Sequence, residues 1–112
     1  MKHTQSLKEN HLFRRAYRRG RCSVQGALVL YALPNRQKTA RLGLTVSPKI
    51  GKAVVRNRVK RRLRECYRLE EEGFKTGFDL VIVTRRAALS VPFDRLRGQL
   101  LAAARDCRVL QK

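Results

Sequence analysis

Three stretches of the chain carry the hydrophobic pattern of β-strands. Residues 27–33 form a compact apolar run that ends at Pro34 and Asn35, a pair typical of turns. Residues 41–47 alternate with a period of two, so their three large apolar side chains face one side and the other residues face the opposite side. Residues 78–84 form a more continuous apolar run, typical of a strand buried on both faces. The pattern therefore predicts three strands.

Helical spacing appears before the first of these strands and after the last. Ser6 is a candidate N-cap, and Glu9 three residues later completes a capping-box pattern. Apolar residues at 12, 13, 16 and 17 then form a helical stripe between arginines, and Gly20 is a natural end to that helix. Pro92 fits the first turn of a last helix, where its missing N–H has no cost. The apolar face of that helix is formed by Phe93, Leu96, Leu100, Leu101 and Ala104.

A third helix is predicted between the second and third strands, and it is strongly basic. Its apolar stripe consists of Val55, Val59, Leu63, Cys66 and Tyr67. The opposite side carries Asn57, Lys60, Arg61, Arg64 and Arg68. Arg56 and Arg62 fall at the borders of the stripe, where we expect the stems to lie along the core and the charged heads to stay in water. Arg56, Asn57 and Arg58 fan around the helix start, which suits a grip on a shaped partner better than a flat surface.

Helices and strands therefore interleave along one domain. The pattern predicts an α+β or α/β sandwich that comprises residues 1–112, with residues 1–6 as an N-terminal arm and residues 105–112 as a C-terminal end that frays. A chain of 112 residues is long enough to bury a hydrophobic core.

Charge is the most unusual property of the sequence. It contains 27 Lys and Arg against 8 Asp and Glu, a formal net charge of +19. A polyanionic partner would relieve that self-repulsion and release its own counterions. Within the basic helix, four like-charge pairs at i, i+4 spacing each cost about 0.2–0.5 kcal/mol. A helix that needed only solubility would mix the signs of its charges, so the pattern favours a nucleic-acid partner.

Other features exclude several classes of protein. No apolar run approaches the roughly 20 residues that span a bilayer, and the N-terminus lacks the apolar segment of a secretory signal. The three cysteines are far apart and suit a reducing cytoplasm. Of the eight acids only Glu70–Glu72 cluster, so we predict no catalytic residue and no protein-bound metal, because two-metal cleavage of RNA needs converging carboxylates.

The central segment is similar to a known family. Residues 51–65 read GKAVVRNRVKRRLRE, and residues 41–51 before them read RLGLTVSPKIG. Both resemble the bacterial ribonuclease P protein, whose "RNR" signature the first stretch carries, and weaker similarity extends over about residues 7–104. The resemblance implies a two-layer α-β sandwich in the order α-β-β-β-α-β-α, of the ribosomal protein S5 domain 2-like type. It also implies an additional short strand near residues 21–24 and a left-handed β-α-β crossover, against the usual hand.

The resemblance further implies partners and sites. The chain would be the non-catalytic protein subunit of an endoribonuclease that removes the 5′ leader of precursor tRNA. It would assemble as one protein with one catalytic RNA, with a higher assembly as the alternative, and that RNA would hold the active site and Mg²⁺. The surface expected to bind the RNA subunit comprises Lys52, Arg56, Asn57, Arg58, Lys60, Arg61, Arg62, Arg64 and Arg68. The cleft expected to bind the leader comprises Phe13, Arg14, Tyr17, Tyr31, Thr45 and Ser47.

Two alternatives stay open at the level of sequence. Phe13 and Tyr17 lie one turn apart on a basic helix, which suits the stacking of RNA bases, but the same spacing is typical of a core stripe. A small ribosomal or RNA-chaperone-type protein would have the same charge without an aromatic cleft. A DNA-binding repressor is disfavoured because strands, not a second helix, flank the basic helix.

Overall fold

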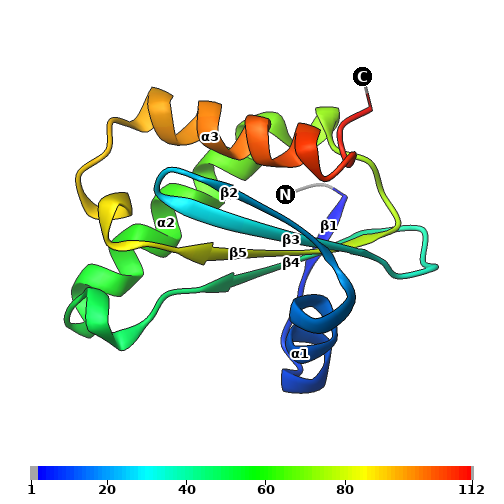
Figure 1. The fold of residues 1–112 in the computed structure, drawn as a ribbon, viewed down its shortest axis with the longest axis horizontal. Helices are drawn as coiled ribbons and strands as arrows, with labels where there is room; N and C mark the ends of the chain where they lie inside the picture. The colour runs from blue at the N-terminus through cyan, green and yellow to red at the C-terminus, as the bar shows by residue number, and fades with distance from the viewer. Residues whose placement is uncertain (1–2, 112) are drawn as a thin grey trace.

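A five-stranded sheet organises the computed structural model, which describes residues 3–111 (Figure 1). The strands are β1 (Thr4–Ser6), β2 (Arg21–Gln25), β3 (Leu28–Pro34), β4 (Ala40–Thr45) and β5 (Phe78–Thr84). Their order across the sheet is β1-β4-β5-β3-β2. β4 lies parallel to both β1 and β5, whereas β3 is antiparallel to β5 and β2.

Helices cover both faces of this sheet. They are α1 (Asn10–Arg19), α2 (Ala53–Glu70) and α3 (Phe93–Asp106), with short 3-10 turns η1 (Pro48–Ile50), η2 (Glu71–Gly73) and η3 (Arg86–Leu89). α2 and α3 lie together on one face, and α1 lies on the other (Figure 1). The main core sits under α2 and α3 and includes Leu30, Leu63, Ile82 and Leu100, which are fully buried. A smaller cluster under α1 contains Leu12, Ala16 and Val81.

The structure confirms the α+β class and the predicted strands. Residues 78–84 form β5 as predicted, while the other two strands are shifted by one or two residues at their ends. The short strand implied near residues 21–24 is β2. β5 is buried on both faces, because Leu80 and Ile82 face the main core and Val81 faces α1. α1 therefore adds a partial third layer to the predicted two-layer sandwich.

The N-terminal predictions were wrong in two respects. Thr4–Ser6, expected to belong to an arm, form β1, and the Leu7 amide extends this pairing by donating to Leu42 O at 2.9 Å. Ser6 is consequently part of a strand and does not cap α1. The N-cap is Glu9, whose side chain makes no capping hydrogen bond. The helix instead ends as predicted at Gly20, whose amide donates to Ala16 O at 2.8 Å.

The C-terminal end is also more ordered than expected. Cys107 and Val109 are buried in the main core, although residues 105–112 were predicted to fray. Backbone hydrogen bonds join Lys75 N to Val109 O at 2.7 Å and Gln111 N to Gly73 O at 2.8 Å. The end is held by these bonds and by an isolated antiparallel bridge between Leu110 and Phe74, beside η2; Lys112 lies outside the described residues.

A buried ion pair fixes the turn between β3 and β4. The carboxylate of Asp79, fully buried on β5, accepts hydrogen bonds from Arg41 Nε at 2.6 Å and Nη2 at 2.9 Å. The same carboxylate accepts from Asn35 Nδ2 at 3.0 Å. Asp79 thereby satisfies its charge inside the sheet, and it ties the turn to the central strand.

Candidate RNA-binding surfaces

The basic helix presents most of its predicted face to solvent. Val59, Leu63, Cys66 and Tyr67 are buried as expected, which turns the opposite side of α2 outward. The predicted residues that are exposed are Lys52, Asn57, Arg58, Arg61, Arg64 and Arg68. The first turn of α2 contains no acidic residue, so the positive end of the helix dipole and the arginine charges add together. Both the helix dipole and the side-chain charges favour an anion at this end of α2.

Two residues predicted to contact RNA instead donate hydrogen bonds to main-chain carbonyls of the protein. Arg56 Nη1 donates to Gly51 O at 2.9 Å and so closes the loop that leads into α2. Arg62 donates to Ala88 O at 3.0 Å and to Val91 O, which ties α2 to the segment after β5. The expectation that the charged head of Arg62 stays in water was therefore wrong, because the main-chain carbonyls of Ala88 and Val91 lie within its reach. Its charge still adds to the basic surface, but two of its donors are committed.

Arg68 and Lys60 also differ from a simple basic stripe. Arg68 pairs with Glu65 one turn earlier, with Nε 2.9 Å from Oε2, and this hydrogen bond lowers the pKa of Glu65. The charge of Arg68 is thus balanced locally. Lys60 is half-buried and borders a groove that runs between α1 and the end of β4. The surface available to a polyanion therefore centres on Arg58, Arg61 and Arg64.

A close approach of helix to sheet positions the aromatic residues of α1. Phe13 lies over Gly43 of β4, where a Cβ atom would fall 2.6 Å from the ring carbons Cε1 and Cζ. Only glycine leaves room for this ring. Phe13 is partly buried in the cluster that includes Leu7 and Val81. For Phe13, the structure therefore favours the core role over free stacking.

Of Phe13 and Tyr17, Tyr17 is the more exposed to solvent. It is 38% exposed, and its hydroxyl forms a 2.8 Å hydrogen bond with Thr45 Oγ1. Its ring meets the Tyr31 ring edge-on, with centroids 5.0 Å apart. Burial, followed by the neighbouring Cys22, raises the pKa of Tyr31. The edge-on contact with Tyr31 restrains the orientation of the Tyr17 ring beside the sheet.

These side chains line a groove of about 440 Å³, which we call the leader groove after the leader cleft predicted from the sequence. It is lined by Asn10, Phe13, Arg14, Tyr17, Leu44, Thr45, Val46 and Lys60. The structure thus brings together four of the six residues predicted for the leader cleft and one predicted for the basic helix. Tyr31 contacts Tyr17 behind this lining. Ser47 points elsewhere, because its hydroxyl caps η1 by accepting from Lys49 N at 3.2 Å.

Sequence reasoning missed three residues of this groove. Leu44 and Val46 were assigned to the buried side of their strand, and they do pack against the main core. They also border the leader groove, because β4 ends there. Asn10 was missed because the helix was predicted to start earlier, whereas Asn10 is the first residue of α1.

The acidic residues of the described chain mostly serve the fold. Glu70 pairs with Arg97 at 2.6 Å, and Glu71 accepts a 2.6 Å hydrogen bond from Thr4 Oγ1. Within residues 3–111, no group of three or more His, Cys, Asp or Glu side chains could hold a metal ion. No helix in that range combines the length and apolarity needed to cross a membrane.

Comparison with known proteins decides the family. A family model described as Ribonuclease P matches residues 1–108. The ribonuclease P protein component of Clostridium botulinum (strain Langeland) is 47% identical over 96 residues, which cover 85% of this chain and 86% of that protein. The chain belongs to the ribonuclease P protein family. The component from Alkaliphilus metalliredigens is 36% identical over 110 residues and covers 98% of this chain and 99% of its own.

Solved structures of ribonuclease P proteins share the fold. That of Staphylococcus aureus superposes with a TM-score of 0.84 at 27% identity, covering 95% of this chain and 97% of that chain. That of Thermotoga maritima superposes with a TM-score of 0.79 at 29% identity, covering 88% and 93%. Membership makes this ribonuclease P protein an RNA-binding protein of tRNA processing and part of an endoribonuclease complex.

Proposed function

We propose that the chain binds the catalytic RNA of ribonuclease P through the exposed basic face of α2, and the 5′ leader of precursor tRNA through the leader groove. The RNA subunit would carry the active site and bind Mg²⁺, and the protein would act with it in the cytoplasm as one protein with one RNA. All the relatives named above are ribonuclease P proteins, so the ribosomal or chaperone-type alternative has no support.

The observation that carries this proposal is the position of Lys60. It belongs to the basic helix, yet it borders the same groove as Tyr17 and Arg14 of α1. A single strand in the leader groove would therefore run beside the helix that faces the catalytic RNA. Cations on both walls would screen the phosphates of the two RNAs from each other, and Tyr17 offers a ring for one base to stack on.

Reconstitution of the holoenzyme from its RNA and protein tests which of the two carries the active site. We expect 5′ maturation of a precursor tRNA by the RNA subunit alone at high Mg²⁺, none by the protein alone, and efficient cleavage at low Mg²⁺ only with both. Cleavage by the purified protein without RNA would contradict the assignment of the active site. The structural roles of Glu70, Glu71 and Asp79 are consistent with the expected result, because these acids are already paired within the chain.

A leader-length series tests the groove. Tyr17→Ala should weaken holoenzyme binding of precursor tRNA by about 1–3 kcal/mol if a base stacks on the ring. Tyr17→Phe keeps the ring and removes only the bond to Thr45, so it is the matched control. The penalty should appear only when the leader is long enough to reach the groove. Equal penalties for precursor and mature tRNA would show that Tyr17 serves the core alone.

The basic face of α2 has its own test. Replacing Arg58, Arg61 and Arg64 together by Ala should weaken binding to the RNA subunit and flatten its salt dependence by about 0.7–0.9 in log–log slope per lost phosphate contact. Arg95→Ala, which removes one exposed positive charge from α3, measures how much the loss of a charge elsewhere on the protein contributes. An unchanged slope in a folded triple variant would mean that this face does not contact the RNA.

A further inference from the structure

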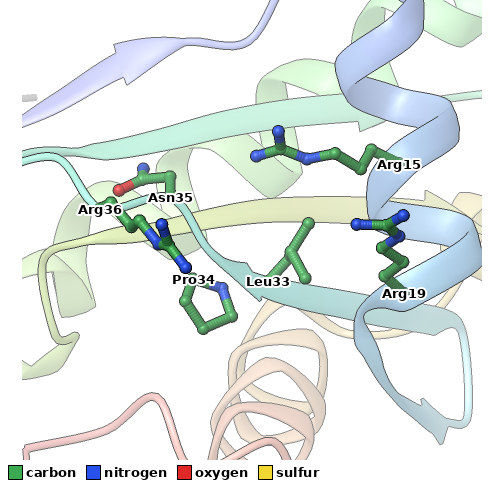
Figure 2. A pocket seen from close by; sticks show the side chains of 6 residues that line it. All are labelled: Arg15, Arg19, Leu33, Pro34, Asn35 and Arg36. Carbon is green, nitrogen blue, oxygen red and sulfur yellow. The ribbon is translucent and has the colours of Figure 1, made fainter.

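A second basic hollow lies on the flank of α1 away from Tyr17. It has a volume of about 380 Å³ and is lined by Arg15, Arg19, Leu33, Pro34, Asn35 and Arg36. In Figure 2, Arg15 and Arg19 project from α1, and Arg36 lies on the turn after β3, with Leu33 and Pro34 between them. Two elements that are far apart in sequence thus place three arginines around one hollow.

These three arginines are unpaired within the described chain. No ion pair or hydrogen bond joins the side chain of Arg15, Arg19 or Arg36 to any of residues 3–111. Other arginines of this protein, such as Arg41 and Arg97, are paired with carboxylates. Three guanidinium groups that line one hollow repel one another, and an anion bound between them would remove that cost.

Hydrogen bonds fix the turn that carries Arg36, and they hold the backbone of Arg36 in a strained conformation. Asn35 is only 8% exposed, and its Nδ2 donates to Asp79 Oδ1 at 3.0 Å and to Thr39 O at 3.2 Å, while its Oδ1 accepts from Gln37 N at 2.8 Å. These bonds hold the next residue, Arg36, at a φ of 59°. An L-residue with a side chain is uncommon in this left-handed region, where glycine or asparagine fits better. An arginine kept in such a position points to a use for its side chain.

The hollow suits one class of ligand. Leu33 and Pro34 provide an apolar floor, and guanidinium groups bind phosphate through paired N–H donors. A ligand with a phosphate and an adjoining flat or apolar part, as in the RNA backbone, matches both features. The outer side of α1 connects this hollow to the leader groove, because His11, Arg14, Arg15, Arg18 and Arg19 line a further basic depression there.

We propose that Arg15, Arg19 and Arg36 form a phosphate-binding site for an RNA backbone, separate from the basic face of α2 and from the leader groove. The phosphate chemistry follows from the hollow alone. That the RNA is the catalytic RNA or the precursor leader rests on the proposed function. The site would extend the RNA contact around α1 to the end of the sheet where β3 stops.

Inorganic pyrophosphate tests the chemistry without any RNA. Titrated into the full-length protein, it should shift the Nε–Hε NMR signals of Arg15, Arg19 and Arg36 more than that of Arg95 on α3. Arg36→Gly suits the left-handed backbone and so should leave the melting temperature unchanged or raised. It should also abolish the preferential shifts of Arg15 and Arg19. Equal shifts at all exposed arginines would overturn the proposal, because they would reflect general charge.

Binding assays with RNA then identify the source of the phosphate. Arg36→Gly should lower the affinity for one RNA about tenfold, the equivalent of one charge-assisted contact, and reduce its salt slope by about 0.7–0.9. A loss with the isolated RNA subunit assigns the site to that RNA. A loss with long-leader precursor tRNA, but not with short-leader or mature tRNA, assigns it to the leader. Arg95→Ala should change neither.

Other outcomes are equally decisive. Unchanged binding of both RNAs would overturn the RNA-backbone assignment even if pyrophosphate binds. Failure of the proposed function can be told apart from failure of this site. In that case the effect of Tyr17→Ala on binding would not depend on leader length, and the pyrophosphate titration would still give the expected shifts.

Discussion

The close contact between Phe13 and Gly43 makes Gly43→Ala the most informative single substitution in this protein. The new Cβ would lie 2.6 Å from two carbons of the Phe13 ring and 3.2 Å from Leu7 Cδ2. Carbon atoms in contact prefer about 3.5–4.0 Å, so the ring must retreat by about 1 Å. Leu7 and Val81 pack against the ring, so it must shift toward the leader groove and strain the position of α1.

Two opposing effects set the magnitude. Replacing glycine by alanine reduces the entropy of the unfolded chain, which by itself would stabilise the protein by about 0.4–1 kcal/mol. Overpacking of a filled site costs about 1–3 kcal/mol, and this term should prevail because the clash is with a ring and not with the end of a flexible chain. We therefore expect the free energy of unfolding to fall by about 1–2 kcal/mol. Displacement of α1 should also break the bond between Tyr17 and Thr45 and weaken leader binding.

Urea unfolding and holoenzyme binding of precursor and mature tRNA measure both effects. Gly98→Ala is the matched control, because a Cβ there meets nothing within 4 Å, and it should stabilise α3 by about 1 kcal/mol. In a double variant, Phe13→Leu should recover part of the loss caused by Gly43→Ala, since the shorter side chain makes room. A neutral or stabilising Gly43→Ala, or strict additivity in the double variant, would refute the packing of α1 described above.

Three further predictions concern buried or committed groups. Asp79→Asn should lower the free energy of unfolding by about 3–5 kcal/mol in denaturant titrations, because it leaves a nearly buried guanidinium without its carboxylate; a loss below 1 kcal/mol would contradict this. Arg62→Ala should cost about 1–2 kcal/mol of stability through its lost bonds to the η3 segment, whereas Arg61→Ala should leave the melting temperature unchanged. Burial raises the pKa of Cys66 to about 11, so this thiol stays protonated at pH 8, and mass spectrometry after alkylation of the native protein should find only the exposed Cys22 modified.

Local patterns along the chain were sufficient for most of the secondary structure and for the basic face. Residues 78–84 form β5, and the buried side of α2 is the predicted one. Both could be predicted because the spacing of apolar residues along the chain, two in a strand and 3.6 in a helix, depends only on neighbouring positions. The net charge of +19 and the RNR segment likewise need no tertiary information, and they led to the correct family.

Contacts between distant residues decided the remainder. β1 is only three residues long and has no pattern of its own, so it exists because β4 offers a parallel edge for its backbone to pair with. Whether Phe13 stacks on RNA or packs in the core depended on a glycine 30 positions away. Arg62 reached carbonyls 26 and 29 residues further along the chain.

The hollow around Arg36 illustrates the same division. The sequence shows an arginine after Pro34 and Asn35 and a helix with several arginines, but nothing local relates the two. Asp79 on β5 holds Asn35, and α1 packs against β3 and β5, so the three arginines line one hollow only once the sheet has formed. Periodicity specifies which side of an element faces inward, whereas hydrogen bonds and packing across the sheet specify which elements meet, and these depend on the whole chain.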